Sequence, residues 1–178
     1  MQKKIIITGG PSTGKSSLIK NLKNKGYCCM DEVSREVILD AREKGIEHLF
    51  ISSPILFSEI LLEKRVAQFH QAEKKTENLV FFDRGIIDIE AYLNFSKTEY
   101  TLNFNSILDA LKYDQIFICP PWKDIHQTDN ERYETFEEAT EIHHQLIRSY
   151  QKEGYVVIEI PFGTIEKRTE FIINKVSY

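Results

Sequence analysis

A run of three isoleucines near the N-terminus leads directly into a glycine-rich segment that opens a predicted helix. The strand-like run covers residues 4–8, and the helix begins near Ser17. The segment between them matches the pattern GxxxxGK[ST] in full. Its glycines allow the loop to curl so that backbone N–H groups face inward, at the positive end of the following helix. A polyphosphate fits such a loop, and the predicted binding residues are Gly9, Gly10, Pro11, Ser12, Thr13, Gly14, Lys15, Ser16 and Ser17.

Two side chains of this loop have predicted roles of their own. Lys15 is expected to face solvent and to reach the β and γ phosphates of a bound nucleotide, and the Ser16 hydroxyl is expected to ligate Mg²⁺. The alternative is an ordinary glycine-rich turn between a strand and a helix. The complete pattern in this strand and helix context arises rarely by chance, so it favours ATP and Mg²⁺ as cofactors.

Short apolar runs rich in β-branched and aromatic residues alternate along the chain with longer segments of helical period. This alternation is typical of a parallel sheet wrapped by crossover helices. The longest helical segment is predicted at 54–75, and others are predicted at 136–150 and near the C-terminus. The predicted fold class is α/β, a five-stranded parallel sheet flanked by helices, with strands at 4–8, 27–30, 79–82, 115–119 and 155–160.

The length of 178 residues predicts one domain, 1–178, because no internal repeat, low-complexity tract or serine-glycine linker divides the chain. One segment, about 120–141, has an unusual composition and is predicted to form a lid-like insert.

Composition argues against several classes of protein. The chain has 23 Lys+Arg and 27 Asp+Glu residues, a formal net charge of −4, and no basic stripe, so nucleic acid is not an expected partner. No apolar run reaches the roughly 18 residues that a membrane-spanning helix needs, so no membrane span is predicted. The three cysteines are an odd number, and two of them are adjacent in a predicted strand where their side chains point to opposite faces, which predicts reduced thiols and a cytoplasmic protein.

The strand predicted at 79–82 is followed by Asp83 and Arg84. Mg²⁺ that bridges two phosphates is held partly by a carboxylate, and a neighbouring strand tip is a suitable place for it. Asp83 is the candidate for this ligand, and the alternative is that it caps the helix after it. Arg84 is a candidate for holding the acceptor or the transferring phosphoryl group, and its alternative is a surface ion pair.

The second predicted strand ends just before Asp31 and Glu32, and Arg35 lies about one helical turn further on. The carboxyl ends of strands in an open α/β sheet meet at one crevice, so these acids are expected to face the same cavity as Asp83. Glu32 is a candidate base or substrate ligand that orients an acceptor hydroxyl, and Arg35 is a candidate for binding a substrate anion. The alternative is that this pair only stabilises a helix N-terminus.

Five blocks of the sequence together resemble a known family. In chain order they are ITGGPSTGKSSLI, DEVSREVI, VFFDRG, ICPPW and DNERYETFEEATEIH, and they extend over nearly the whole chain. They are similar to the AAA-domain P-loop family related to the NadR-like nicotinamide riboside kinases. The resemblance implies a P-loop NTPase fold like that of nucleoside and nucleotide kinases, in which a lysine, an acid-arginine pair and a mobile lid surround ATP and an acceptor.

By the same resemblance, Glu32 and Arg35 correspond to the block after the second strand, the pair after the third strand to the acid-arginine block, and Arg132 to the lid arginine. Such a lid would supply a cation to the γ-phosphoryl oxygens and exclude water. Residues 131–141 nevertheless hold five acids and one base, whereas a phosphate lid is usually basic. Most of the acids are therefore expected on the outer face of the following helix with Arg132 alone facing inward, and the alternative is that Arg132 pairs with the surrounding glutamates.

The leading hypothesis is a kinase that transfers the γ-phosphoryl group of ATP to a small-molecule hydroxyl or phosphate acceptor. Its predicted catalytic residues are Lys15, Asp83, Arg84 and Arg132. The rival hypothesis is a nucleotide-dependent switch or NTPase that acts through a protein or lipid partner. A full AAA+ motor would need a helical lid domain for which this chain has no room, and the absence of an NKxD signature argues against a GTPase.

Overall fold

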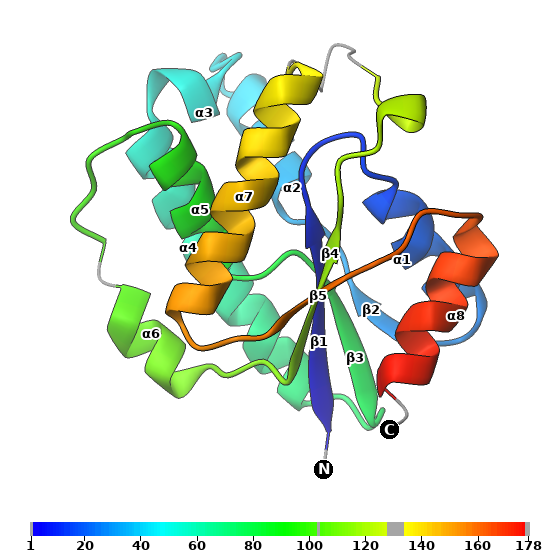
Figure 1. Cartoon of the computed structure of the whole chain (residues 1–178). Helices are drawn as coiled ribbons and strands as arrows, with labels where there is room; N and C mark the ends of the chain where they lie inside the picture. Colours follow the sequence, from blue (N-terminus) through cyan, green and yellow to red (C-terminus); the bar gives the residue numbers. More distant parts are fainter. Residues whose placement is uncertain (1, 103, 128–133, 177–178) are drawn as a thin grey trace.

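A five-stranded sheet forms the centre of the molecule in the computed structural model, which describes residues 2–102, 104–127 and 134–176 (Figure 1). The strand order is β2-β3-β1-β4-β5, and every neighbouring pair is parallel. The α/β class and the five predicted strands are confirmed, with shorter bounds at both edges of the sheet. The strands are β1 (Lys3–Gly9), β2 (Cys28–Met30), β3 (Leu79–Asp83), β4 (Gln115–Cys119) and β5 (Val157–Glu159).

Helices connect these strands. The predicted long helix, the helix after the lid segment and the C-terminal helix are all present, whereas the sequence pattern did not single out the two shortest helices. The helices are α1 (Lys15–Asn24), α2 (Ser34–Glu43), α3 (Leu49–Ser52), α4 (Pro54–Glu73), α5 (Ile87–Phe95), α6 (Phe104–Ala110), α7 (Phe136–Lys152) and α8 (Ile165–Val176), with a 3-10 turn at Lys123–Ile125.

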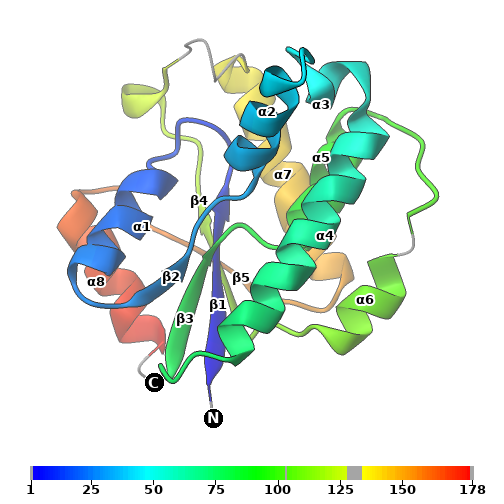
Figure 2. The same ribbon diagram turned by 180° about the vertical axis from the view of Figure 1, so that it is seen from behind.

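Helices cover both faces of the sheet, with α1 and α8 on one face and α4, α5 and α7 on the other (Figures 1 and 2). Strand β1 shows why its sequence is a continuous apolar run. Ile5 and Ile7 belong to the core under α1 and α8, and Ile6 belongs to the core under the other helices. A strand buried on both faces needs apolar residues at every position, not at alternate ones.

The long helix α4 differs from the expected pattern of one apolar side and one charged side. Its buried side chains include Ser58, Arg65 and Gln68 beside Leu61 and Phe69. Two of these polar groups contact the chain just after β2 and β3, since Gln68 Nε2 donates to the Asp31 carbonyl at 2.7 Å and Arg65 Nη1 donates to the Gly85 carbonyl. The buried side of α4 therefore packs in the core and also supports the site described below. Within the described residues, no helix is both long enough and apolar enough to cross a membrane.

Candidate active site

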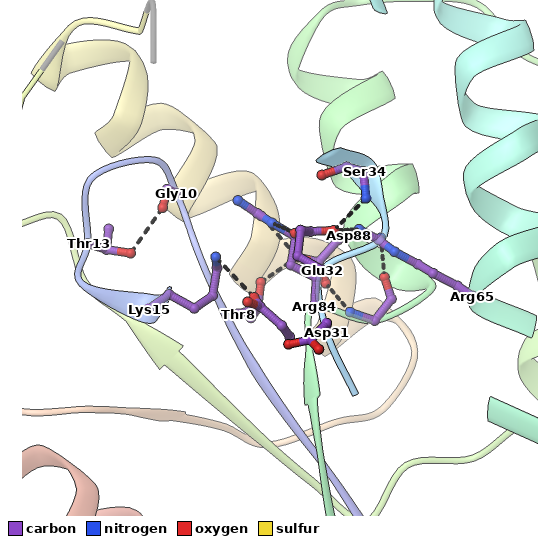
Figure 3. Close-up of polar contacts among 12 residues, drawn as sticks. Thr8, Gly10, Thr13, Lys15, Asp31, Glu32, Ser34, Arg65, Arg84 and Asp88 are labelled. Atoms are coloured by element: carbon purple, nitrogen blue, oxygen red, sulfur yellow. Dashed lines mark hydrogen bonds and ion pairs between the residues drawn. The ribbon is translucent and has the colours of Figure 1, made fainter. Parts of the chain in front are cut away.

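The glycine-rich loop lies between β1 and α1, at the carboxyl edge of the sheet (Figure 3). Gly9 has a φ of 149°, and a Cβ there would stand 2.8 Å from the carbonyl oxygen of Cys119 on β4. Gly14 is the N-cap of α1 in the left-handed region, with a φ of 78°. The Thr13 hydroxyl closes the loop by donating to the Gly10 carbonyl at 3.0 Å. These constraints explain why glycine stands at both ends of the curl.

Lys15 begins α1, and its Nζ atom lies 3.1 Å from Oδ1 of Asp83, the last residue of β3. Both side chains are buried, so the expectation that Lys15 faces solvent is wrong. The carboxylate of Asp83 attracts the ammonium inward across the edge of the sheet. The capping role for Asp83 is also not what the structure shows, because α5 has Ile86 at its N-cap and no side chain caps it.

The residues beside Lys15 are suitable for Mg²⁺. Asp83 Oδ1 is buried and, apart from its ion pair with Lys15, has no hydrogen-bond partner among the described residues, and the Ser16 side chain is exposed in the first turn of α1. Among the described residues, no group of three or more His, Cys, Asp or Glu side chains could hold a metal by itself. One carboxylate, one hydroxyl, phosphate oxygens and water are the ligand set that Mg²⁺ takes in nucleotide sites. The donor atoms present therefore fit Mg²⁺ bound together with a polyphosphate.

A second charged cluster surrounds Glu32, two residues after the end of β2 (Figure 3). Glu32 Oε1 accepts hydrogen bonds from the Ser34 backbone N–H at 3.1 Å and from Arg65 Nη2 at 3.3 Å. Glu32 Oε2 lies 2.6 Å from Arg84 Nε. Arg65 Nη1 also donates to the Gly85 carbonyl at 2.5 Å, so one guanidinium holds both the carboxylate and the chain after β3.

These contacts determine the ionisation of the cluster. Burial acts to raise the pKa of Glu32, but Arg65, Arg84 and Lys15 lower it to about 2. Burial likewise acts to lower the pKa of Arg84, while Tyr92, Glu32 and Asp88 raise it well above its ordinary value. Glu32 is therefore a carboxylate and Arg84 a guanidinium at every pH at which the enzyme would work.

Arg84 adopts an uncommon backbone conformation. Its φ is 72°, in the left-handed region that a residue with a long side chain rarely occupies. Its amide donates to the Ile7 carbonyl at 3.1 Å, which extends the pairing of β1 with β3 by one residue. The guanidinium lies 5.3 Å from the centre of the Tyr92 ring. The unusual φ turns the chain immediately after Asp83, so consecutive residues serve the two charged clusters.

Several predicted site residues are placed outside these clusters. The Asp31 carboxylate, which was expected to face the same cavity as Asp83, is 71% exposed and pairs with Lys23 on α1 at 2.6 Å. Arg35 is exposed in the first turn of α2. Arg132 lies outside the described residues, so its predicted lid role stays a prediction. Of the remaining loop residues, Pro11 and Ser12 lie in the curl, where the Ser12 hydroxyl donates to the Gln127 carbonyl at 2.6 Å, and Ser17 lies in the first turn of α1.

Three residues of the site were not found by reasoning from the sequence. Arg65 and Asp88 belong to the cluster around Arg84. Arg168 on α8 is only 2% exposed and donates from Nη1 to the Thr13 carbonyl at 3.1 Å. This hydrogen bond connects the loop to α8. The sequence does contain a sign of Arg65, because this charged residue lies between Leu61 and Phe69 on the same side of α4, where an apolar residue is expected.

Helix α7 also contacts the loop. A Cβ on Gly10 would stand 3.2 Å from the Ala139 carbonyl in the second turn of α7, so only a glycine allows this approach without a shift. The exposed glutamates of α7, Glu137, Glu138 and Glu141, point to solvent, as expected for the acids of this region. Trp122 after β4 packs against Phe162 at 5.1 Å between ring centres.

Solved structures share this fold. A deoxyadenosine kinase from M. mycoides, solved with the products dCMP and a flexible dCDP, superposes with a TM-score of 0.70 and 16% identity over 98% of this chain and 98% of that chain. A NadR protein in complex with NR superposes with a TM-score of 0.73 and 18% identity over 98% of this chain. The chain spans 50% of the length of that NadR protein. At these identities the likeness establishes the P-loop NTPase fold.

Among curated protein sequences, no relative of the chain was found. The AAA domain family matches residues 4–168, which include the loop, both charged clusters and Arg168. This match extends over most of the chain, and the protein therefore belongs to the AAA domain family.

Proposed function

We propose that this protein is a kinase that transfers the γ-phosphoryl group of ATP to a hydroxyl of a small, nucleoside-like acceptor. The observation that carries the proposal is the position of two charged clusters at one edge of the sheet. The Lys15 and Asp83 pair stands beside the phosphate loop, and the Glu32 and Arg84 pair lies next to it, since Arg84 directly follows Asp83 at the end of β3. The first cluster suits a phosphoryl donor and the second suits an acceptor.

On the donor side, backbone N–H groups of the loop and the N-terminus of α1 would bind the β and γ phosphates. Lys15 would exchange its contact with Asp83 for phosphate oxygens. Ser16 and Asp83 would hold Mg²⁺, which neutralises charge on the phosphates when it is bound. Arg168 would help to keep the Thr13 peptide in place through its hydrogen bond to the Thr13 carbonyl.

On the acceptor side, Glu32 would accept the proton of the attacking hydroxyl. The acceptor oxygen forms a bond to the γ phosphorus, the bond between that phosphorus and the bridging oxygen of ADP breaks, and the proton moves to the carboxylate. Phosphoryl transfer requires little activation of the nucleophile, so a carboxylate of low pKa is adequate when it is well positioned. Arg84, held between Glu32 and Asp88, would stabilise the charge on the transferring group.

The charges of the two clusters favour a neutral acceptor over a phosphorylated one. Three cations, Lys15, Arg65 and Arg84, stand with three carboxylates, Asp83, Glu32 and Asp88, and each cation already contacts a carboxylate. A nucleoside monophosphate would bring two further negative charges into this balanced arrangement. An uncharged nucleoside needs only a hydrogen-bond acceptor for its hydroxyl, which Glu32 supplies. The names of two solved structures with this fold, a deoxyadenosine kinase and a NadR protein in complex with NR, agree with a nucleoside acceptor.

The chain is further proposed to be one catalytic domain, 1–178, in which the segment 120–141 acts as a lid and Arg132 contacts the γ-phosphoryl group. The contact of Gly10 with Ala139 supports this proposal, because it brings the start of α7 to the phosphate loop. Arg35, exposed at the start of α2, is the candidate for binding a polar group at the outer end of the acceptor.

Acceptor-stimulated release of ADP tests the function. Purified protein with ATP and Mg²⁺ is offered a panel of nucleosides and, separately, the matching 5′-monophosphates. We expect nucleosides to stimulate ADP release and the monophosphates to leave it near the basal rate. Glu32→Gln should lose the stimulation, and Asp31→Asn, which removes an exposed neighbouring carboxylate, should keep it. Release that does not depend on any acceptor would contradict the proposal and favour a nucleotide-dependent switch.

A further inference from the structure

Asp88 is a buried carboxylate in the first turn of α5 that accepts hydrogen bonds from four donors. Figure 3 shows it beside Thr8 and Arg84. It is 1% exposed. Its Oδ1 atom accepts from the Thr8 hydroxyl at 2.5 Å and from Arg84 Nη1 at 3.3 Å. Its Oδ2 atom accepts from the Gly85 backbone N–H at 3.0 Å and from the Tyr150 hydroxyl at 2.6 Å. A buried carboxylate is costly unless it is paired and fully hydrogen-bonded, and this one is both.

Two of these contacts hold Arg84. The bond to Nη1 fixes one end of the guanidinium, whose Nε atom contacts Glu32. The bond to the Gly85 N–H fixes the peptide that follows Arg84, at the point where the chain has a positive φ. A strained backbone conformation persists only when the surrounding structure determines it. Asp88 therefore restrains both the main chain and the side chain of Arg84.

The other two contacts reach the elements that carry the phosphate loop. Thr8 is the residue before Gly9 in β1, and its buried hydroxyl binds Asp88. Tyr150 is a fully buried residue of α7, the helix whose Ala139 carbonyl abuts Gly10. Asp88 thus links Arg84 to the loop by two routes, one through β1 and one through α7.

We propose that Asp88 is a positioning residue that fixes the Arg84 guanidinium relative to the phosphate loop and so aligns the acceptor side of the site with the donor side. This inference rests on the proposed function in one respect, namely that Arg84 serves phosphoryl transfer. Asp88 itself is enclosed by protein atoms and acts through Arg84.

The variant Asp88→Asn is a sharp test because of its hydrogen-bonding capacity. Its amide nitrogen replaces either Oδ1 or Oδ2. The hydroxyls of Thr8 and Tyr150 can rotate to accept, but Arg84 Nη1 and the Gly85 N–H can only donate. In either orientation a donor that holds Arg84 therefore meets another donor. We expect kcat for the nucleoside to fall about 10²-fold, as for misplacement of a reacting group by about 1 Å, with a much smaller change in KM for ATP.

A double-mutant cycle separates positioning from general loss of structure. If Asp88 acts through Arg84, Asp88→Asn should lower kcat in the wild-type background and should have no further effect on an Arg84→Ala protein. Independent effects that multiply in the double variant would overturn the inference. Glu90→Gln is the matched control, because Glu90 is a carboxylate of the same helix, 3% exposed, that pairs with Lys152 and Tyr100 instead. It should leave kcat unchanged.

A spectroscopic readout makes the test independent of the acceptor. The Nε–H signal of Arg84 in ¹⁵N-labelled protein is assigned by its disappearance in Arg84→Lys. We expect this signal to shift or to be lost through exchange with water in Asp88→Asn and to stay in place in Glu90→Gln. An unchanged signal in Asp88→Asn would overturn the inference. A wild-type protein that no nucleoside stimulates, but whose Arg84 signal depends on Asp88, would instead refute the proposed function alone.

If Asp88→Asn does not fold, Tyr150→Phe carries the test, because it removes a single donor from Asp88 Oδ2. It should shift the Arg84 signal and lower kcat in the wild-type background only. A Tyr150→Phe protein with an unaltered Arg84 signal and an unchanged kcat would overturn the inference.

Discussion

At the scale of single residues, the ion pair of Lys15 and Asp83 makes a prediction about both stability and turnover. Lys15→Ala should abolish turnover because it removes the phosphate ligand, and it should lower the free energy of unfolding by about 3 kcal/mol because it leaves a buried carboxylate unpaired. The double variant Lys15→Ala/Asp83→Asn should recover most of that stability without recovering turnover. Chemical denaturation and ADP release measure the two effects, and a Lys15→Ala protein as stable as the wild type would contradict the buried pair.

Asp83→Asn alone tests the metal site. The amide keeps the size of the side chain but is a weaker ligand for Mg²⁺ than a carboxylate. We therefore expect the Mg²⁺ concentration that gives half-maximal ADP release to rise, while the requirement for a divalent ion remains. Asp31→Asn, on an exposed carboxylate at the end of the neighbouring strand, is the control and should not change the response to Mg²⁺. An identical Mg²⁺ titration for Asp83→Asn and wild type would remove Asp83 from the metal site.

The pKa of Glu32 predicts the acid side of the pH profile. The pKa of this carboxyl is held at about 2, against 4.5 for the unperturbed group, so Glu32 stays ionised in weakly acidic solution. We therefore expect kcat/KM for the acceptor to show no loss from protonation of Glu32 between about pH 8 and pH 5. Its contribution to stability should be complete above pH 4.5 and disappear as the pH falls toward 2. A fall in kcat/KM for the acceptor with an apparent pKa near 6, seen in the wild type and also in Asp31→Asn, would contradict the low pKa of Glu32.

At the scale of elements, α7 begins with a capping box that stabilises the part of the helix next to the phosphate loop. The Thr135 hydroxyl accepts from the Glu138 N–H, and the Glu138 carboxylate accepts from the Thr135 N–H. Thr135→Ala should lower the free energy of unfolding by about 1 kcal/mol. Thr140→Ala, which removes a hydroxyl bonded to the Phe136 carbonyl within the same helix, should have a smaller effect. Equal losses in urea denaturation for the two variants would contradict the importance of the cap.

The elements themselves could be predicted from the sequence because each carries a local pattern. The isoleucine run of β1, the glycines of the loop and the apolar spacing of α7 all depend on near neighbours in the chain. The partners of these elements depend on packing between distant residues. Arg65 and Gly85 are 20 residues apart in the sequence, and Tyr150 and Asp88 are 62 apart, so neither contact can be predicted from a local pattern.

The same distinction applies to the candidate site. Lys15 is predictable from the GxxxxGK[ST] pattern, and Asp83 and Glu32 are predictable because each comes at the end of a strand at the same edge of the sheet. The direction of each side chain was less predictable. Asp31 and Glu32 are adjacent, but Asp31 turns outward to Lys23 while Glu32 is drawn inward by Arg65 and Arg84. Buried arginines supplied by α4 and by the turn after β3 decide which acid enters the site, and those arginines become visible only in three dimensions.

At the scale of the whole molecule, nucleotide binding should stabilise the fold. The loop connects β1 to α1 and contacts β4, α7 and α8, so a ligand that holds it couples to most of the structure. At a concentration of about 100 times its Kd, a ligand that binds only the folded state adds about 2.7 kcal/mol, which corresponds to roughly 5–11 °C in Tm for a chain of this size. Thermal unfolding with and without ATP and Mg²⁺ measures the shift, and Lys15→Ala should reduce it strongly. No shift with any purine triphosphate would refute nucleotide binding.

The central position of β1 also affects how the chain is synthesised. This strand pairs with β3 at 79–83 and with β4 at 115–119, so its edge toward β3 stays open until residue 83 has left the ribosome and its edge toward β4 until residue 119 has. A growing polypeptide therefore exposes an isoleucine-rich strand for most of its translation, and such open edges are sites of aggregation. The glycine curl that follows this strand reaches its working shape only late, when β4 arrives beside it. We therefore expect chaperones that bind exposed apolar segments during translation to act mainly on the first ten residues.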